Sequence, residues 1–133
     1  RTADEVWARI GNFVDVSWIP KTESSRLDGD IRTVQMKGSN RLKGQNIEVS
    51  QQLLHHDDAA RTYSYCLATN MDFESMFGPG RKLTQFRGTI AVEPHEDAAA
   101  RVTFDIETDE FLAGAINQEY QRALNNLKAL MEA

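Results

Sequence analysis

The sequence predicts an α+β protein in which a meander of antiparallel strands packs against one long C-terminal helix. The apolar residues between Leu112 and Met131 recur at helical spacing and fall on one stripe, while most polar residues lie off it. The middle of the chain consists of strand-like runs separated by turn residues, and it offers no second long helix to cover this stripe. We therefore expect the C-terminal helix to lie on one face of the sheet.

The N-terminal segment opens with a helix signal. Thr2 and Glu5 have the spacing of a capping box, in which the Thr2 hydroxyl accepts a hydrogen bond from the Glu5 amide and the Glu5 side chain reaches back. Residues 13–18 are apolar and irregular, and Pro20 disfavours a helix beyond them. We expect one or two short helices here, with Trp18 as a large packing group.

Five or six consecutive strands follow these helices. Asp-Gly in the turn at 28–30 is a hairpin signal, and a second turn at 57–60 separates two further extended runs. By the two-residue period of a strand, Gln51 and His55 share one face. The predicted strand segments are 24–27, 31–36, 47–56, 61–67, 83–92 and 102–106.

The composition bounds the class of protein and of partner. The chain of 133 residues has room for one core, so we expect a single domain over residues 1–133. The formal net charge is −5 and no stretch concentrates Lys and Arg, which argues against nucleic acid as a partner. Since no run of about 18 apolar residues exists, we expect no stable membrane insertion. The single cysteine, Cys66, cannot form an internal disulfide, which fits a cytoplasmic location; a removed signal peptide is the alternative.

No pattern in the sequence predicts a metal, a cofactor or a nucleophile. His55 and His56 are neighbours on a strand and point to opposite faces, so they do not easily share one ion. The glycines of the 78–80 loop are followed by Arg81 rather than by a helix start, so this loop is not a phosphate cradle. We expect neither a metal nor a cofactor.

Three features point to the space between sheet and helix. The first is a set of aromatic residues that can all face this space, and its alternative is an ordinary filled core. The second is Lys21, beside a strand that reaches the same space, with a solvated lysine as its alternative. The third is the pair of glycine-bearing loops 37–46 and 70–82, which either close over one end of the sheet or are ordinary surface loops. The aromatic residues are Tyr63, Tyr65, Phe86, Phe104 and Tyr120.

Several segments, in their order and spacing, resemble one family. The sequence is similar to the polyketide cyclase/dehydrase and lipid-transport group of the helix-grip (START, birch-pollen-allergen-like, SRPBCC) superfamily, in the branch of small bacterial proteins similar to the abscisic acid receptors. The resemblance covers nearly the whole chain. Its segments are TADEVWARIGNF, VSWIP, DIRTV, QQLLHHDDAARTYSYCL, FRGTIAV, VTFDIE and YQRALNNLKALME.

This resemblance implies a seven-stranded antiparallel sheet curled around the long C-terminal helix, with an apolar cavity between them. The family has a strand before its short helices. Here the sequence begins at the helix cap, so we expect that strand to be missing upstream of residue 1 and the sheet to expose the edge where it would pair.

The resemblance also suggests roles for four residues. Lys21 matches the lysine that binds the ligand carboxylate in the abscisic acid receptors. Gln51 matches a glutamate that lines their cavity, so the charge is lost at this position. Tyr65 and Phe86 match aromatic residues of the next two strands. The receptors' gate and latch patterns are absent from residues 38–46 and 70–82, which argues against a hormone-receptor switch.

The function favoured by these observations is binding of a small hydrophobic ligand, such as a lipid or a polyketide, in the cavity. The first alternative is an enzyme of the polyketide aromatase/cyclase type, with proton-transfer candidates Tyr65, His55, Glu119 and Lys21. The second is a protein-interaction module with a filled core and a surface patch in the 73–77 loop. A homodimer is an alternative to a monomer. The predicted ligand-binding residues are Trp18, Lys21, Gln51, Tyr63, Tyr65, Phe86, Phe104, Ile116, Glu119 and Tyr120.

Overall fold

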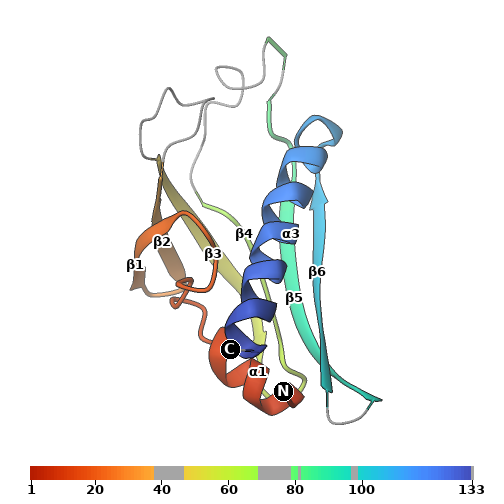
Figure 1. The fold of residues 1–133 in the computed structure, drawn as a ribbon. Helices are drawn as coiled ribbons and strands as arrows, with labels where there is room; N and C mark the ends of the chain where they lie inside the picture. The colour runs from red at the N-terminus through yellow and green to blue at the C-terminus, as the bar shows by residue number, and fades with distance from the viewer. Residues whose placement is uncertain (38–46, 69–78, 81, 97–98, 133) are drawn as a thin grey trace.

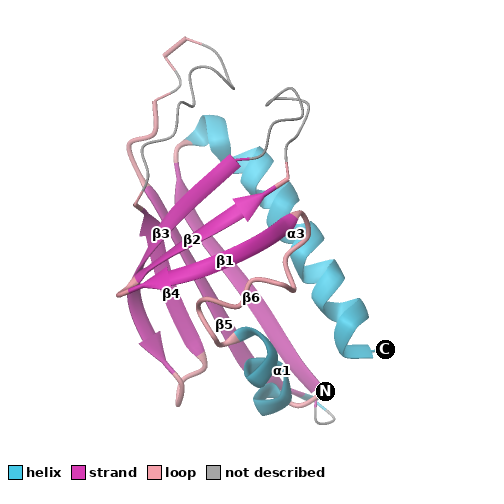
Figure 2. Cartoon of the chain, turned by 90° about the vertical axis from the view of Figure 1, so that its left-hand side faces the viewer, coloured by secondary structure: helices cyan, strands magenta, loops and turns pink. Residues whose placement is uncertain are grey.

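The computed structural model describes residues 1–37, 47–68, 79–80, 82–96 and 99–132. In this part of the chain, antiparallel strands form one curled six-stranded sheet in the order β1-β2-β3-β4-β5-β6, and the long helix α3 lies along one face of it (Figures 1 and 2). The elements are α1 (Ala3–Ile10), β1 (Thr22–Asp28), β2 (Ile31–Met36), β3 (Ile47–Asp57), β4 (Thr62–Leu67), β5 (Phe86–His95), β6 (Ala99–Thr108) and α3 (Glu110–Glu132). The helix-grip fold is thereby confirmed.

Helix α1 begins as the sequence predicts. The Thr2 side chain accepts a hydrogen bond from the Glu5 amide at 3.2 Å, and the Glu5 carboxylate accepts one from the Thr2 amide at 3.3 Å. Residues 11–21 then form turns rather than a second helix. The side chains of Asn12 and Asp15 accept hydrogen bonds from backbone amides two residues further on, and such local bonds compete with helix formation.

The predicted hairpins are present, and β1 and β6 form the two edges of the sheet. Gly29 occupies the turn between β1 and β2 with φ of +60°, a conformation that glycine adopts without strain. The seventh strand that the family resemblance implies is not among the elements of the described residues.

Strand β5 begins three residues later than predicted. The amides of Thr84 and Gln85 donate hydrogen bonds to the Asp109 carboxylate at 2.6 and 3.4 Å, so this segment is bound to the start of α3. The same segment holds the pKa of Asp109 below its ordinary value, because the Thr84 hydroxyl and amide both stabilise the carboxylate.

A bulge in β3 reverses which side chains face the core. Leu53 pairs with a residue of β4 that faces inward, and His55 pairs with the neighbouring residue of β4, which faces outward. The extra residue of β3 between Leu53 and His55 shifts the register. His56 therefore turns inward, and its Nε2 lies 2.8 Å from the carbonyl oxygen of Gly11. The prediction that His55 shares a face with Gln51 is wrong because strand parity does not continue through the bulge.

Aromatic stacking fills part of the space between sheet and helix. Trp18 stacks on Phe104 with ring centroids 5.8 Å apart, and Phe104 stacks on Tyr120 at 4.4 Å. Trp18 is fully buried, and its carbonyl oxygen accepts a hydrogen bond from the Asn126 side chain at 2.7 Å. This stack closes the space beneath the middle of α3 and leaves the region toward the N-terminal end of the helix to be lined by other side chains.

None of the described helices combines the length and apolar character that crossing a membrane requires.

Candidate functional site

A cavity of about 230 Å³ lies between the sheet and the N-terminal half of α3, and we call it the inner cavity. Its wall comes from the segment before β1, the start of β1, strands β2, β3 and β4, the start of β5, and α3. The described residues that line it are Val16, Ile19, Thr22, Arg32, Val34, Met36, Val49, Gln51, Tyr65, Leu67, Phe86, Leu112, Ile116, Glu119 and Tyr120. A concave, largely apolar hollow with a few converging polar groups is the usual form of a small-molecule site.

Tyr65 and Tyr120 form the polar floor of the inner cavity. Their hydroxyl groups hydrogen-bond to each other across the gap between β4 and α3. Burial raises the pKa of Tyr65 well above its ordinary value, and burial likewise raises the pKa of Tyr120 to about 12. Both phenols are therefore protonated at neutral pH and can donate a hydrogen bond but supply no negative charge.

Arg32 is the cationic group of the inner cavity. It lies on β2 and is 2% exposed. Its Nε donates to Oε1 of Gln51 at 2.7 Å, and its Nη1 donates to the Phe13 carbonyl oxygen at 2.6 Å. The guanidinium carbon also lies 4.2 Å from the centroid of the Phe13 ring and 4.8 Å from that of Tyr65. These neutral oxygens and ring faces partly replace the water that the buried charge has lost.

Glu119 lies at the margin of the same cavity with its carboxylate turned to two surface cations. Oε1 of Glu119 accepts a hydrogen bond from Nη1 of Arg122 at 2.8 Å and lies 3.9 Å from Nζ of Lys21. The side chains of Lys21 and Glu119 are each about two-fifths exposed. The negative charge of Glu119 is thus neutralised outside the cavity, and Lys21 itself is not among the lining residues.

Six of the predicted ligand-binding residues line the inner cavity and four do not. Tyr63 lies behind the Tyr65 ring, at a centroid distance of 6.2 Å. Trp18 and Phe104 belong to the stack beneath the cavity, and Lys21 is the fourth residue outside the lining. The six residues that line it are Gln51, Tyr65, Phe86, Ile116, Glu119 and Tyr120.

The most informative residue that the sequence analysis missed is Arg32. A signal for it exists, because Arg32, Val34 and Met36 alternate with Thr33 and Gln35 along β2. The arginine is therefore the charged member of an otherwise apolar strand face.

Two of the predicted features lie outside the described residues. The loops 38–46 and 69–78, and with them the apolar patch at 73–77, are not described. Among the residues that are described, no group of three or more His, Cys, Asp and Glu side chains is arranged to hold a metal ion.

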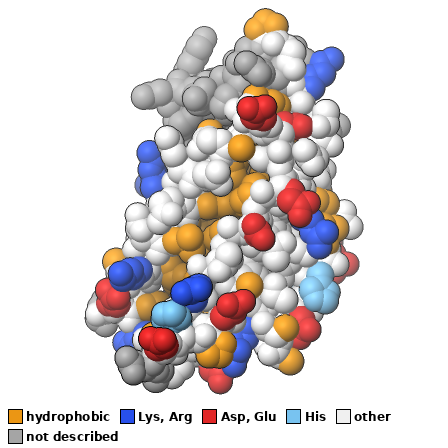
Figure 3. Space-filling view, turned by 90° about the vertical axis from the view of Figure 1, so that its right-hand side faces the viewer, with side chains coloured by type: hydrophobic (Ala, Val, Ile, Leu, Met, Phe, Trp, Pro, Cys, Tyr) orange, Lys and Arg blue, Asp and Glu red, His pale blue; other side chains and the backbone are white. Residues whose placement is uncertain are grey.

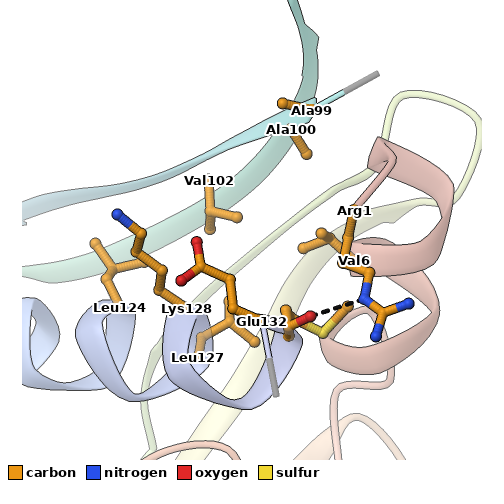
Figure 4. A pocket seen from close by; sticks show the side chains of 10 residues that line it. Arg1, Val6, Ala99, Ala100, Val102, Leu124, Leu127, Lys128 and Glu132 are labelled. Atoms are coloured by element: carbon orange, nitrogen blue, oxygen red, sulfur yellow. Dashed lines mark hydrogen bonds between the residues drawn. The ribbon is translucent and has the colours of Figure 1, made fainter. Parts of the chain in front are cut away.

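Two other hollows open more widely to solvent than the inner cavity. One, of about 360 Å³, lies between the end of α3, the start of β6 and α1. Figure 4 shows that charged side chains border it, including Lys128 and Glu132, and that the Arg1 side chain reaches the backbone of Met131, with Nε 2.7 Å from the carbonyl oxygen. The face toward β6 and α3 shows apolar atoms in a central strip with charged groups around it (Figure 3).

The third hollow, of about 450 Å³, lies beside α1 and the β3–β4 hairpin. The indole Nε1 of Trp7 donates to Oδ1 of Asp58 at 2.9 Å there, so the polar groups at its edge already have partners. We therefore regard the inner cavity as the candidate site.

Comparison with known proteins places the chain in a family. The family model described as polyketide cyclase / dehydrase and lipid transport matches residues 1–132. No curated protein sequence matches the chain.

Solved structures show the same fold at low sequence identity. An uncharacterised protein from Bacillus thuringiensis is 21% identical with a TM-score of 0.78, over 99% of this chain and 92% of that one. The protein XoxI from Bacillus cereus is 19% identical with a TM-score of 0.75, over 97% and 87% of the two chains. The ZhuI aromatase/cyclase from Streptomyces sp. R1128 is 15% identical with a TM-score of 0.66, over 98% and 87%. The chain belongs to the polyketide cyclase/dehydrase and lipid-transport family, as its sequence segments led us to expect.

Proposed function

We propose that this protein binds a small hydrophobic ligand in the inner cavity. The observation that carries the proposal is the cavity itself, which persists between sheet and helix although the Trp18, Phe104 and Tyr120 rings fill the adjoining space. Protein interiors are close-packed, and an unfilled apolar hollow lowers stability unless something occupies it. Membership of a family that includes lipid-transport proteins supports the same function.

The cavity volume restricts the size of the guest. About 230 Å³ lies below the range of about 300–1,000 Å³ that is common for ligand pockets. A single aromatic ring with a short side chain, or a short aliphatic chain, fits this space.

The test combines a cavity-filling substitution with a matched control on the same helix. Ile116→Trp places an indole in the cavity, whereas Leu130→Trp places one on the exposed side of α3, where the leucine is 45% exposed. We expect neutral probes such as 3-phenylpropanamide and hexanamide to bind wild type and Leu130→Trp equally in titration calorimetry. Ile116→Trp should weaken this binding by about tenfold or more. Equal affinity in all three proteins would refute the proposal, and so would the absence of wild-type binding both by these amides and by the carboxylic acids of the same shape.

An enzyme of the aromatase/cyclase type remains the alternative, because Tyr65 and Tyr120 offer hydroxyl donors inside the cavity. Such donors can polarise a carbonyl group, but a cyclase also has to remove a proton from its substrate. The one carboxylate that lines the described part of the cavity is that of Glu119, and it is paired with Arg122. Cyclised product formed from a polyketide substrate by wild type, and absent with Tyr65→Phe, would favour the enzyme over the binding protein.

A further inference from the structure

The inner cavity contains a positive charge that no carboxylate of the described residues neutralises. Arg32 has no acidic group within 4.0 Å among the described residues, although it is almost completely buried. All of its hydrogen-bond acceptors are neutral: the side-chain oxygen of Gln51, the carbonyl oxygen of Phe13 and, at 3.5 Å, the hydroxyl of Tyr63. A buried charge without a counter-ion is costly and is usually paired.

Three kinds of group near Arg32 could act as its counter-ion, and each is prevented from doing so for a different reason. Glu119 is held at the cavity margin by Arg122 and Lys21. The phenols of Tyr65 and Tyr120 stay protonated because burial raises the pKa of each. Position 51 faces Arg32 at hydrogen-bonding distance but carries an amide instead of a carboxylate.

One nitrogen of the guanidinium is also available. Nε and Nη1 of Arg32 donate to protein oxygens, whereas Nη2 has no hydrogen-bond partner among the described residues. Nη2 can therefore donate a charge-assisted hydrogen bond to a carboxylate oxygen while the bonds of Nε and Nη1 stay in place. A phosphate monoester, with a charge of about −1.5 to −2 at neutral pH, would overcompensate this single cation and bury excess negative charge.

We propose that the inner cavity binds a small organic monocarboxylate, whose carboxylate pairs with Arg32 and whose apolar body lies along Val34 and Met36. The proposal rests on the function proposed above, since it requires the same cavity to hold a ligand. Residues 32, 34 and 36 of β2 all line the cavity. At about 3.3 Å per residue, the strand between residues 32 and 36 is roughly 13 Å long. The site thus has a cationic end at Arg32 and an apolar end beside Met36 and Ile116.

The test compares carboxylates with neutral amides of the same shape. The pairs are 3-phenylpropanoate with 3-phenylpropanamide and hexanoate with hexanamide, titrated calorimetrically into wild-type protein at pH 7. We expect each acid to bind at least about tenfold more tightly than its amide, because a charge-assisted hydrogen bond in a site shielded from water is stronger than a neutral one. Acids and amides of equal affinity would overturn this proposal and leave the proposed function standing. If neither class bound, the proposed function would fail as well.

Two substitutions locate the effect at Arg32. Arg32→Met removes the charge and keeps an apolar stem, so the acid should lose its advantage while the affinity for the amide changes by less than about threefold. Gln51→Glu supplies an internal carboxylate at the position that now hydrogen-bonds to Nε of Arg32, and it should abolish the acid preference in the same way. This second variant keeps the charge and decides the question if Arg32→Met does not fold.

Two further variants test whether another cation explains the acid preference. Arg26→Met is the matched control, because Arg26 lies on the neighbouring strand with its side chain 65% exposed and 3.6 Å from the carboxylate of Glu48. The acid preference should persist in this variant. Lys21→Met tests whether the lysine at the cavity margin recognises the head group instead. Loss of the acid preference in Lys21→Met together with its survival in Arg32→Met or Gln51→Glu would overturn the assignment to Arg32.

Discussion

Gly88 of β5 lies opposite Tyr65 of β4, and the absence of a side chain there allows the tyrosine ring to lie against the β5 backbone. A Cβ atom on Gly88 would lie 2.7 Å from Cζ of Tyr65 and 2.9 Å from its hydroxyl oxygen. The ring has little room to retreat, because Tyr65 is 1% exposed and its hydroxyl is bonded to Tyr120. To reach an ordinary 3.4 Å contact, the ring or the strand has to move by 0.7 Å in the variant Gly88→Ala.

The magnitude follows from two opposing effects. Overpacking a dense core costs about 1–3 kcal/mol. Exchange of glycine for alanine by itself raises the free energy of unfolding by about 0.5–1 kcal/mol, because alanine has less backbone freedom to lose on folding. We therefore expect Gly88→Ala to lower the free energy of unfolding by about 1 kcal/mol, the difference between the centres of these two ranges. For a domain of this size, each kcal/mol corresponds to a fall in Tm of roughly 3–6 °C.

The assay is urea denaturation, with Gly114→Ala as the matched control. Gly114 lies in α3, and a Cβ on it would meet nothing within 4 Å, so the same exchange should raise stability by about 0.5–1 kcal/mol. Removing the ring with Tyr65→Leu should make the effect of Gly88→Ala much smaller in the double variant. The reasoning is refuted if Gly88→Ala is as stable as wild type, or if its cost is unchanged when the ring is absent.

Three further results are expected. Tyr120→Phe should cost about 1–3 kcal/mol by leaving the buried Tyr65 hydroxyl unpaired, whereas the double variant with Tyr65→Phe should cost less than the sum of the single exchanges in denaturant titrations. Because folding raises the pKa of Tyr120 from about 10 to about 12, the unfolded state loses its proton first. The contribution of Tyr120 to stability should be constant between pH 7 and 10 and fall by roughly 2–3 kcal/mol between pH 10 and 12, with a smaller fall in Tyr120→Phe. Thr2→Ala removes the N-cap of α1 and should lower stability by about 0.5–2 kcal/mol in thermal melts.

Features of the fold that depend on local patterns were predictable from the sequence. The α3 helix was expected over residues 112–131 and is present over Glu110–Glu132, because a long apolar stripe at helical spacing is a strong signal. The capping box of Thr2 and Glu5 and the turn at Gly29 involve residues close in sequence, and both are present. The family resemblance added the curvature of the sheet around the helix, which no local pattern contains.

Features that depend on contacts distant in sequence were not predictable. The bulge after Leu53 is not visible in the alternating pattern of β3, yet it decides that His56 rather than His55 contacts the core. Lys21 was chosen because it lies beside a strand that reaches the space between sheet and helix, and because the resemblance assigns a carboxylate to it. Its position beside Glu119 depends on packing between the residues before β1 and α3. The alternation along β2 places Arg32 on the same strand face as Val34 and Met36, but its burial depends on contacts with segments distant in sequence, such as that of Phe13.

Two unfavourable features coincide in the inner cavity. The hollow leaves apolar side chains without partner atoms on one side, and Arg32 keeps a positive charge out of water without a counter-ion among the described residues. Filling the cavity with apolar side chains would remove only the first of these costs, and a carboxylate at position 51 would remove only the second. An amphipathic monocarboxylate removes both at once. Binding of such a ligand should therefore raise Tm with concentration, since occupancy at 100 times Kd adds about 2.7 kcal/mol to the free energy of unfolding.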